Sequence, residues 1–307
     1  MILEQQRVVL ANGIELDTVD TGPADNAGGD APALIFLHGF PESHRTWRHQ
    51  IAHLSDRFRC IAPDQRGYRG SSKPQDVASY TPDKLIGDVF ALADALGVGE
   101  FTILGHDWGG AIAWGVALGG QANGRVTRAV IANAPHPAIF PRLLFTDPQQ
   151  RAASQYFRAF REPANDALVE QFGLAGMLLK AFGERERAAL NDEQDQLYAD
   201  WLNRDAARAM LNWYRASPMA VPPLDAPFAL PADYRPLPVP LLTIPTLVIW
   251  AMEDDALPPS NLDGLEDYVS DLTVVRVPQS GHFVTWEATA AVNAALDAFL
   301  VPQQHAG

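Results

Sequence analysis

Short apolar runs alternate with longer amphipathic patterns along most of this chain. The apolar runs predict strands at residues 33–37, 58–62, 101–104, 126–132, 246–250 and 273–277. Helical patterns separate them, and residues 288–300 form an amphipathic closing helix. Residues 8–18 read as two short strands around Asn12-Gly13, and residues 21–32 as a loop. Alternating strands and helices predict an α/β fold, with a mostly parallel sheet covered by helices on both faces.

The middle of the chain has a different pattern. No strand is predicted between about residues 136 and 216, where helical patterns occur instead. They cover 149–161, 165–172, 192–202 and 205–216, with Asn191 and Asp205 as predicted N-caps. Nine of the 24 prolines then fall between Pro218 and Pro245, a segment that cannot continue a helix. We therefore predict a core in two parts, 1–135 and 241–307, and an inserted helical cap with its return linker at 136–240.

Composition narrows the class of protein. With 307 residues and 47% hydrophobic side chains, the chain can bury a sizeable core. The 23 basic and 37 acidic side chains give a net charge of −14, which argues against a nucleic-acid or anionic-membrane partner. Cys60 is the single cysteine, which excludes an internal disulfide. No leader opens the chain, and no uncharged apolar run reaches the roughly 18 residues of a membrane span, so we expect a cytoplasmic monomer or homodimer.

The most informative motif is Gly105-His106-Asp107-Trp108-Gly109-Gly110. It lies where a predicted strand turns sharply into a helical run, with small residues two before and two and three after Asp107. This is the pattern of a nucleophile elbow, whose turn admits only small neighbours. Esterases and lipases have serine at the tip. An aspartate there indicates a covalent alkyl-ester intermediate instead of an acyl one.

Two further residues complete a catalytic order. Asp107, Asp254 and His282 each follow a predicted strand, in the nucleophile–acid–histidine order of the α/β-hydrolase fold. Sites in open α/β sheets form at the carboxyl ends of strands, where all three are expected. Asp255 and Glu253 compete with Asp254 as the acid.

Several stretches together resemble the epoxide-hydrolase branch of the α/β-hydrolase superfamily, over nearly the whole chain. They are His38-Gly39-Phe40-Pro41, Asp64-Gln65-Arg66-Gly67-Tyr68, Gly105-His106-Asp107-Trp108-Gly109-Gly110, Asn133-Ala134-Pro135-His136-Pro137, Asn212-Trp213-Tyr214-Arg215, Trp250-Ala251-Met252-Glu253-Asp254 and Gly281-His282-Phe283. The resemblance implies the α/β-hydrolase fold. In that family the acid lies four residues after the position of Trp250, which favours Asp254 as the acid.

The resemblance also implies how charge is stabilised. In that family the first stretch and the elbow build an oxyanion hole, so the donors here are the backbone N–H groups of Phe40 and Trp108. Donors fixed in place beforehand stabilise charge as it develops. Pro41 corresponds to a cis proline, and His38 to a structural residue. We also interpret His106 and His136 as hydrogen-bonding parts of the scaffold.

The predicted cap supplies two tyrosines. Family members hold the epoxide oxygen between two phenol groups. One precedes a Phe-x-Glu-Pro-like stretch, here beginning at Tyr156, and the other lies in Asn-Trp-Tyr-Arg, here Tyr214. Opening the strained ring creates an alkoxide that needs a proton donor, and two phenols can share this role.

The implied reaction needs only a small-molecule epoxide and water. Asp107 attacks an epoxide carbon, and water activated by His282 hydrolyses the resulting ester to a vicinal diol. No metal or organic cofactor is implied. His49 and His53 stand four apart on a predicted helix, but without an evident third ligand we interpret them as ordinary histidines.

Arg69 departs from the family pattern, which usually has glycine at this position. We expect either a differently shaped loop or an arginine that reaches outward into solvent.

The main alternative is a haloalkane or haloacid dehalogenase, which uses the same aspartate, histidine and acid. Trp108 matches a halide-binding tryptophan, whereas Phe40 stands where many such enzymes have asparagine. Fluoroacetate-type enzymes have arginine at the positions of Trp108 and Ala111, and His-Trp where this chain has Gln155-Tyr156. A non-catalytic receptor of this fold is disfavoured because no triad member is missing, and a serine esterase because aspartate occupies the tip.

Overall fold

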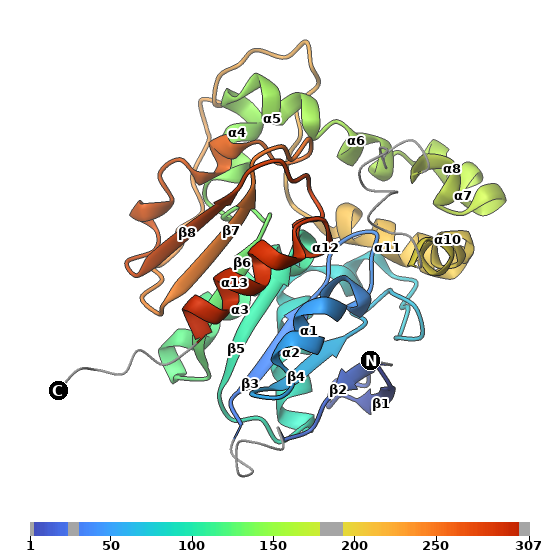
Figure 1. Ribbon diagram of the computed structural model, residues 1–307. Coiled ribbons are helices and arrows are strands. Elements are labelled where there is room, and N and C mark those ends of the chain that lie inside the picture. Colours follow the sequence, from blue (N-terminus) through green and yellow to red (C-terminus); the bar gives the residue numbers. More distant parts are fainter. Residues whose placement is uncertain (1–2, 24–30, 179–192, 301–307) are drawn as a thin grey trace.

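One mostly parallel sheet organises the molecule (Figure 1). The computed structural model describes residues 3–23, 31–178 and 193–300. Within these ranges the strand order is β1-β2-β4-β3-β5-β6-β7-β8. The strands are β1 Gln5–Val9, β2 Glu15–Asp20, β3 Ala33–Leu37, β4 Arg59–Pro63, β5 Phe101–His106, β6 Val126–Ala132, β7 Thr246–Ala251 and β8 Leu272–Val277.

The predicted α/β-hydrolase architecture is confirmed. Strands β4, β3, β5, β6, β7 and β8 pair in parallel, and only β1 and β2 at one edge are antiparallel. Strands β3, β5 and β7 are buried at every position, as expected when helices cover both faces of a parallel sheet. Burial on both faces therefore explains why the sequences of these strands are continuously apolar.

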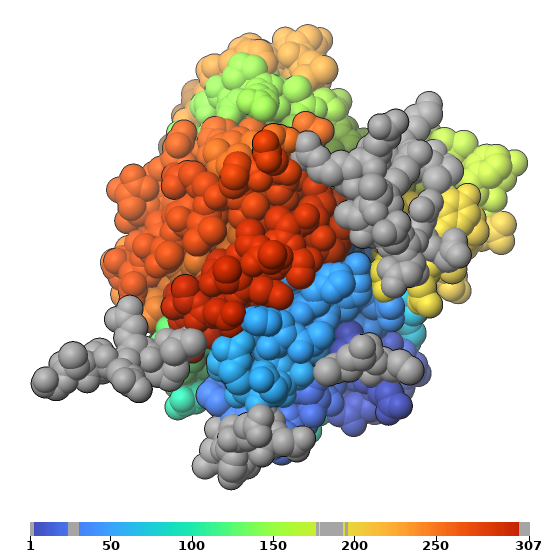
Figure 2. Space-filling model, viewed as in Figure 1, coloured from blue at the N-terminus to red at the C-terminus, as the bar shows by residue number. Residues whose placement is uncertain are grey.

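Alternate side chains of each strand contact helices on opposite faces of the sheet. Leu34 and Phe36 of β3 pack into the cluster that includes helices α1 and α13, which lie side by side on the face seen in Figure 2. Ile35 and Leu37 belong to the cluster on the other face, with helices α2 and α3. The bounds are α1 Arg48–Leu54, α2 Pro82–Ala95, α3 Trp108–Gly120, α12 Val284–Glu287 and α13 Thr289–Leu300.

A largely helical segment separates β6 from β7 and lies beyond one end of the sheet (Figure 1). Its helices are α4 Phe140–Thr146, α5 Pro148–Ala153, α6 Tyr156–Arg161, α7 Asp166–Phe172, α8 Ala175–Leu178, α10 Gln194–Leu202 and α11 Arg204–Ala216. We call them the inserted helices. The division into domains at residues 135/136 and 240/241 stays a prediction. No helix in the described ranges is long and apolar enough to cross a membrane.

Three local predictions in this segment need correction. The single helix predicted at 149–161 is two helices, α5 and α6, because the chain turns at Ser154, whose hydroxyl accepts a hydrogen bond from the Gln150 amide. Helix α4 was not predicted. The N-cap of α11 is Asn203 and not Asp205, since the Asn203 side chain accepts from the Ala206 N–H at 3.0 Å. Asn191 and much of the 21–32 loop lie outside the described residues.

Candidate active site

Asp107 occupies a sharp turn between β5 and α3. Its backbone has φ 52° and ψ −122°, an unusual conformation for a residue other than glycine. A methyl group on Gly105 would overlap the carbonyl oxygen of Gly109, and one on Gly109 would overlap that of His38. Small residues are therefore required on both sides of the turn, which explains the glycines of the elbow motif.

The loop after β3 lies directly against the Asp107 carboxylate. The Phe40 N–H donates to Asp107 Oδ1 at 2.6 Å, and the Phe40-Pro41 peptide is cis. A side chain on Gly39 would overlap Asp107. Trp108 is the first residue of α3, so its backbone N–H has no partner within the helix. The Phe40 N–H thus contacts the carboxylate directly, and the Trp108 N–H is left without an intrahelical partner at the start of α3.

A largely buried histidine, 14% exposed, connects Asp107 to a second carboxylate. His282 Nε2 lies 3.3 Å from Asp107 Oδ2, and His282 Nδ1 lies 2.8 Å from Asp254 Oδ2. Asp254 is fully buried, and its other oxygen accepts the backbone N–H groups of Ala256 and Leu257 at 2.8 and 2.9 Å. Asp254, and not its exposed neighbour Asp255, contacts the histidine.

The charges of these three groups shift one another's pKa. Burial lowers the pKa of His282, but the charge of Asp254 and the hydrogen bond with Asp107 outweigh it, so the pKa lies well above its usual value. Burial raises the pKa of Asp107 and of Asp254, but His282 outweighs it in each case and both pKa values are lowered. The geometry therefore favours an imidazolium held between two carboxylates.

Asn133 fixes the Asp254 carboxylate, a role that the sequence reasoning missed. The residue follows β6 with φ 40°, and its side-chain N–H donates to Asp254 Oδ2 at 2.6 Å. Its side-chain oxygen accepts from the Ala251 N–H at 2.9 Å. The signal was present: Asn133 directly follows a predicted strand, as the other polar residues of this site do.

A second buried carboxylate–imidazole pair lies beside the first. His106 Nδ1 is 3.0 Å from Glu42 Oε2, and His106 Nε2 is 2.8 Å from the carbonyl oxygen of His282. Glu42 also accepts from the Trp286 indole N–H at 2.8 Å. His106 therefore supports the backbone of the residue that contacts Asp107, in line with its expected scaffold role.

His38 and His136 also contact the surrounding backbone. His38 Nε2 accepts the Gln65 N–H at 3.0 Å, which leaves Nδ1 to donate to the Gly39 carbonyl at 2.9 Å. His136 Nδ1 accepts the Ala138 N–H at 3.3 Å, and burial lowers the pKa of this histidine to about 4. Both residues are consistent with the scaffold interpretation.

Two tyrosines from different inserted helices meet near Asp107. Tyr156 begins α6 and Tyr214 lies in α11, and their ring centroids are 5.8 Å apart at an interplanar angle of 77°. Burial is the main cause that raises the pKa of both phenols, and the charge of Asp107 raises each further. Both side chains therefore stay protonated at neutral pH and can act as hydrogen-bond donors.

Two cavities meet at these residues, because Asp107 and Tyr156 line both. The first, of about 230 Å³, is almost entirely apolar, with Trp108, Ile112 and Phe140 in its wall. The second, of about 460 Å³, adds Tyr214, His282 and the exposed carboxylates of Glu253 and Asp255. A small organic molecule can therefore extend on either side of Asp107.

Comparisons with known proteins identify the family. Residues 32–289 match the model of the α/β-hydrolase fold family. A solved structure of an epoxide hydrolase from metagenomes of hot environments is 66% identical, covers 98% of this chain and 100% of that one, and has a TM-score of 0.92. The chain belongs to the epoxide-hydrolase branch of the α/β-hydrolase superfamily.

More distant members of this epoxide-hydrolase branch cover the chain almost as fully. The epoxide hydrolase of Caballeronia sordidicola is 30% identical over 95% of this chain and 92% of its own length. The crystal structure of the Bacillus megaterium epoxide hydrolase is 29% identical, covers 96% and 99% of the two chains, and has a TM-score of 0.80. The likeness therefore spans the inserted helices as well as the sheet.

The sequence left open that Arg69 reaches outward into solvent, and the structure shows that it does not. Its guanidinium lies 2.9 Å from Asp200 Oδ2 in α10 and 3.5 Å from Asp64 Oδ2, and its side chain is 23% exposed. The loop is nevertheless compatible with the glycine usual in this epoxide-hydrolase family, because Arg69 has φ 43°. A position that suits glycine here carries a side chain that contacts an inserted helix.

No group of three His, Cys, Asp or Glu side chains that could hold a metal ion occurs among the described residues. Of the two histidines spaced for zinc, His53 instead pairs with Asp297 at 2.8 Å.

Proposed function

We propose that this chain is an epoxide hydrolase that forms a hydroxyalkyl ester on Asp107 and releases a vicinal diol. One observation carries the proposal. The Asp107 carboxylate lies between the Phe40 N–H and His282 Nε2, and borders a cavity that Tyr156 and Tyr214 also line. The names of the family members above support the same reaction.

In the first step, Asp107 Oδ attacks an epoxide carbon and the C–O bond of the ring breaks. The lowered pKa of Asp107 keeps this nucleophile ionised at neutral pH. Tyr156 and Tyr214 donate to the epoxide oxygen, and one phenol proton passes to the alkoxide that forms. The inserted helices act as a cap in this proposal, because they supply both phenols.

In the second step, His282 accepts a proton from water, which attacks the ester carbonyl of Asp107. The ester C–O bond then breaks, the diol leaves with a proton from the added water, and the proton on His282 returns to the phenolate left by the first step. Ester formation removes the negative charge of Asp107, one of the causes that raise the pKa of His282. The first step therefore lowers the pKa of the base that the second step needs. Asp254, held by Asn133, keeps the imidazole oriented while it becomes charged.

The oxyanion of the second step is stabilised by backbone donors. The Phe40 N–H already contacts Asp107 Oδ1, and this oxygen becomes the carbonyl oxygen of the ester. The Trp108 N–H at the start of α3 is the proposed second donor.

A substrate panel tests the function. Aryl, alkyl and terpenoid epoxides are assayed for diol, beside haloalkanes and fluoroacetate assayed for halide. We expect diol from at least one epoxide class and no comparable halide release. Halide release without any diol would support the dehalogenase alternative. The cytoplasmic location and the monomeric or homodimeric state stay predictions.

The tyrosines give a second test. Tyr156→Phe and Tyr214→Phe should each slow ester formation by about 10²-fold, since one positioned proton donor contributes about 10²–10⁴-fold. Hydrolysis of the preformed ester should be largely unaffected. Rapid-quench single-turnover kinetics separate the two rates. If both variants alkylate at the parent rate, the phenols are not the proton donors.

The two steps should differ in their pH dependence. Ester formation should stay constant between about pH 5 and 8, because Asp107 has a pKa below the usual ~3.9 and both tyrosines stay protonated. Ester hydrolysis needs neutral His282, so its rate should fall about tenfold per pH unit below the pKa of His282 in the ester. The ester should therefore accumulate in acid. Parallel pH profiles for the two steps would contradict this assignment.

A further inference from the structure

Helix α10 touches the loop that carries the Phe40 N–H. The indole Nε1 of Trp201 donates to the carbonyl oxygen of Pro41 at 3.0 Å, in a buried hydrogen bond. Trp201 is 5% exposed. Pro41 follows Phe40 directly, so an inserted helix holds the residue next to the donor that faces Asp107.

Trp201 is itself held firmly. Its carbonyl oxygen accepts the Leu174 N–H at 2.7 Å, and a methyl group on Gly173 would overlap the same oxygen. The adjacent Asp200 pairs with Arg69 of the core. The indole can therefore serve as a fixed point for the Pro41 carbonyl.

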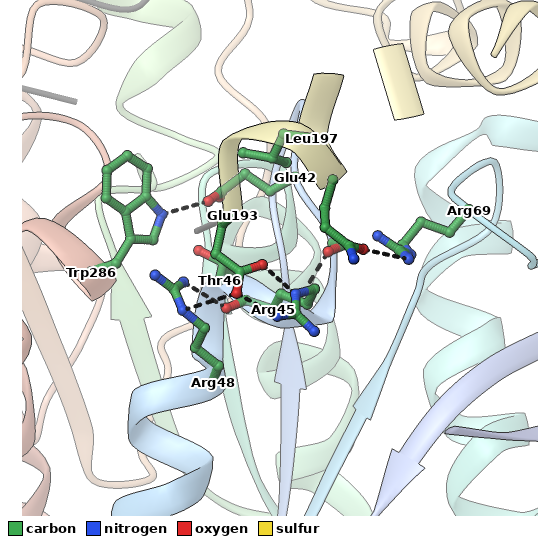
Figure 3. Close-up of a pocket in the computed structure, with 10 residues that line it drawn as sticks. Glu42, Arg45, Thr46, Arg48, Arg69, Glu193, Leu197 and Trp286 are labelled. Carbon is green, nitrogen blue, oxygen red and sulfur yellow. Dashed lines mark hydrogen bonds and ion pairs between the residues drawn. The ribbon is translucent and has the colours of Figure 1, made fainter. Parts of the chain in front are cut away.

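The other end of α10 is also tied to the core. Figure 3 shows Glu193, which precedes the helix, pointing toward Arg45 and Arg48. Arg45 forms an ion pair with the Glu193 carboxylate, and Arg48 lies 3.7 Å from it. The Glu193 side chain is only 5% exposed, so little water competes for these contacts. Both ends of α10 are thus tied to the core, one of them to the Phe40 loop itself.

We propose that Trp201 is a positioning residue for the oxyanion hole: its indole N–H fixes the Pro41 carbonyl and thereby the Phe40 N–H. The proposal rests on the proposed function, in which Phe40 stabilises the oxyanion of ester hydrolysis. Donors of this kind act because they are placed before charge develops. A displacement of about 1 Å at a reacting centre can cost about 10²-fold in rate.

The two chemical steps depend on this donor in opposite ways. During ester formation Asp107 loses its charge, so its hydrogen bond with Phe40 weakens. During hydrolysis the same oxygen gains a full negative charge, and the bond strengthens. A loosened Phe40 loop should therefore slow hydrolysis and spare ester formation, a split that a general loosening of the inserted helices does not produce.

The test is Trp201→Phe, which removes the indole N–H and keeps an aromatic ring in the buried site. Rapid-quench single turnovers with a reactive epoxide, read by intact-protein mass, give both rates. We expect hydrolysis to slow about tenfold, a part of the 10²–10³-fold that loss of a whole oxyanion donor costs, with ester formation within about twofold of the parent. The alkylated fraction at steady state should rise accordingly.

Leu202→Ala is the matched control. It changes the neighbouring residue of α10, whose side chain is 48% exposed, and leaves the indole in place. We expect both rates to stay within about twofold of the parent, because exposed side chains contribute little. A control that slows hydrolysis as much as Trp201→Phe would overturn the assignment to the indole.

Equal slowing of both steps in Trp201→Phe, or parent rates in both, would also overturn it. If this variant does not fold, replacement of Trp201 by 3-benzothienylalanine carries the same test, because sulfur replaces the N–H in a ring of nearly equal shape. If no epoxide alkylates the parent protein, the proposed function itself is wrong. That result differs from a fully active parent whose Trp201 variants show no split.

Discussion

Asp107→Ala should lower diol formation from any epoxide by about a millionfold, the scale on which loss of a covalent nucleophile acts in other enzymes. The buried carboxylate of Asp254 cannot replace it, since it is turned toward Asn133 and the backbone N–H groups of Ala256 and Leu257. The measurement is steady-state diol formation with a sensitive chromatographic assay.

The fold should survive this change. The Asp107 side chain borders both cavities and is not part of either hydrophobic cluster. Far-ultraviolet circular dichroism and thermal unfolding of the variant should match those of the parent closely. Asp263→Ala, at an exposed carboxylate away from the site, is the control and should keep parent activity. Residual diol well above trace would favour direct attack by water on the epoxide.

His282→Gln should stop the enzyme at the ester of its first turnover. Only ester hydrolysis needs a base, so steady-state turnover should fall at least about ten-thousandfold, the upper range for one acid–base group. Ester formation should continue, provided Asp107 stays ionised. Loss of His282 removes the main cause that lowers the Asp107 pKa, so the assay is run near pH 8, well above the usual carboxylate value of about 4.

The control for this variant is His53→Gln. His53 is 35% exposed, pairs with Asp297 on α13 and lines neither cavity. It should retain parent turnover. A His282→Gln enzyme that turns over many epoxide molecules per active site would show that another group supplies the base.

Much of the fold follows from local pattern. Strands β3 and β6 have the predicted bounds, and the other parallel strands differ by one or two residues at their ends, because continuous apolar runs are what a sheet buried on both faces requires. The elbow was also predictable. Its glycines are demanded by atoms within a few residues of Asp107 or in the adjacent loop, so the motif itself carries the geometry.

Other features depend on partners far along the chain. Asn133 fixes Asp254 across 121 residues, and Trp201 reaches Pro41 across 160. Arg69 turns to Asp200 because an inserted helix lies over it, which no local pattern indicates. The break at Ser154 leaves the apolar spacing of 149–161 undisturbed, so periodicity alone predicts one helix. Tertiary contact decided the positions of Asn133, Trp201 and Arg69, whereas the break at Ser154 goes with a local hydrogen bond to Gln150.

The covalent ester on Asp107 is tested most directly by the intact mass of His282→Gln after incubation with an epoxide. We expect a gain of one full substrate mass, located on a peptide that contains Asp107. A haloalkane would instead add its mass less that of hydrogen halide, so the mass separates the two reactions. An adduct from a halide, with none from any epoxide in the panel, would contradict the account.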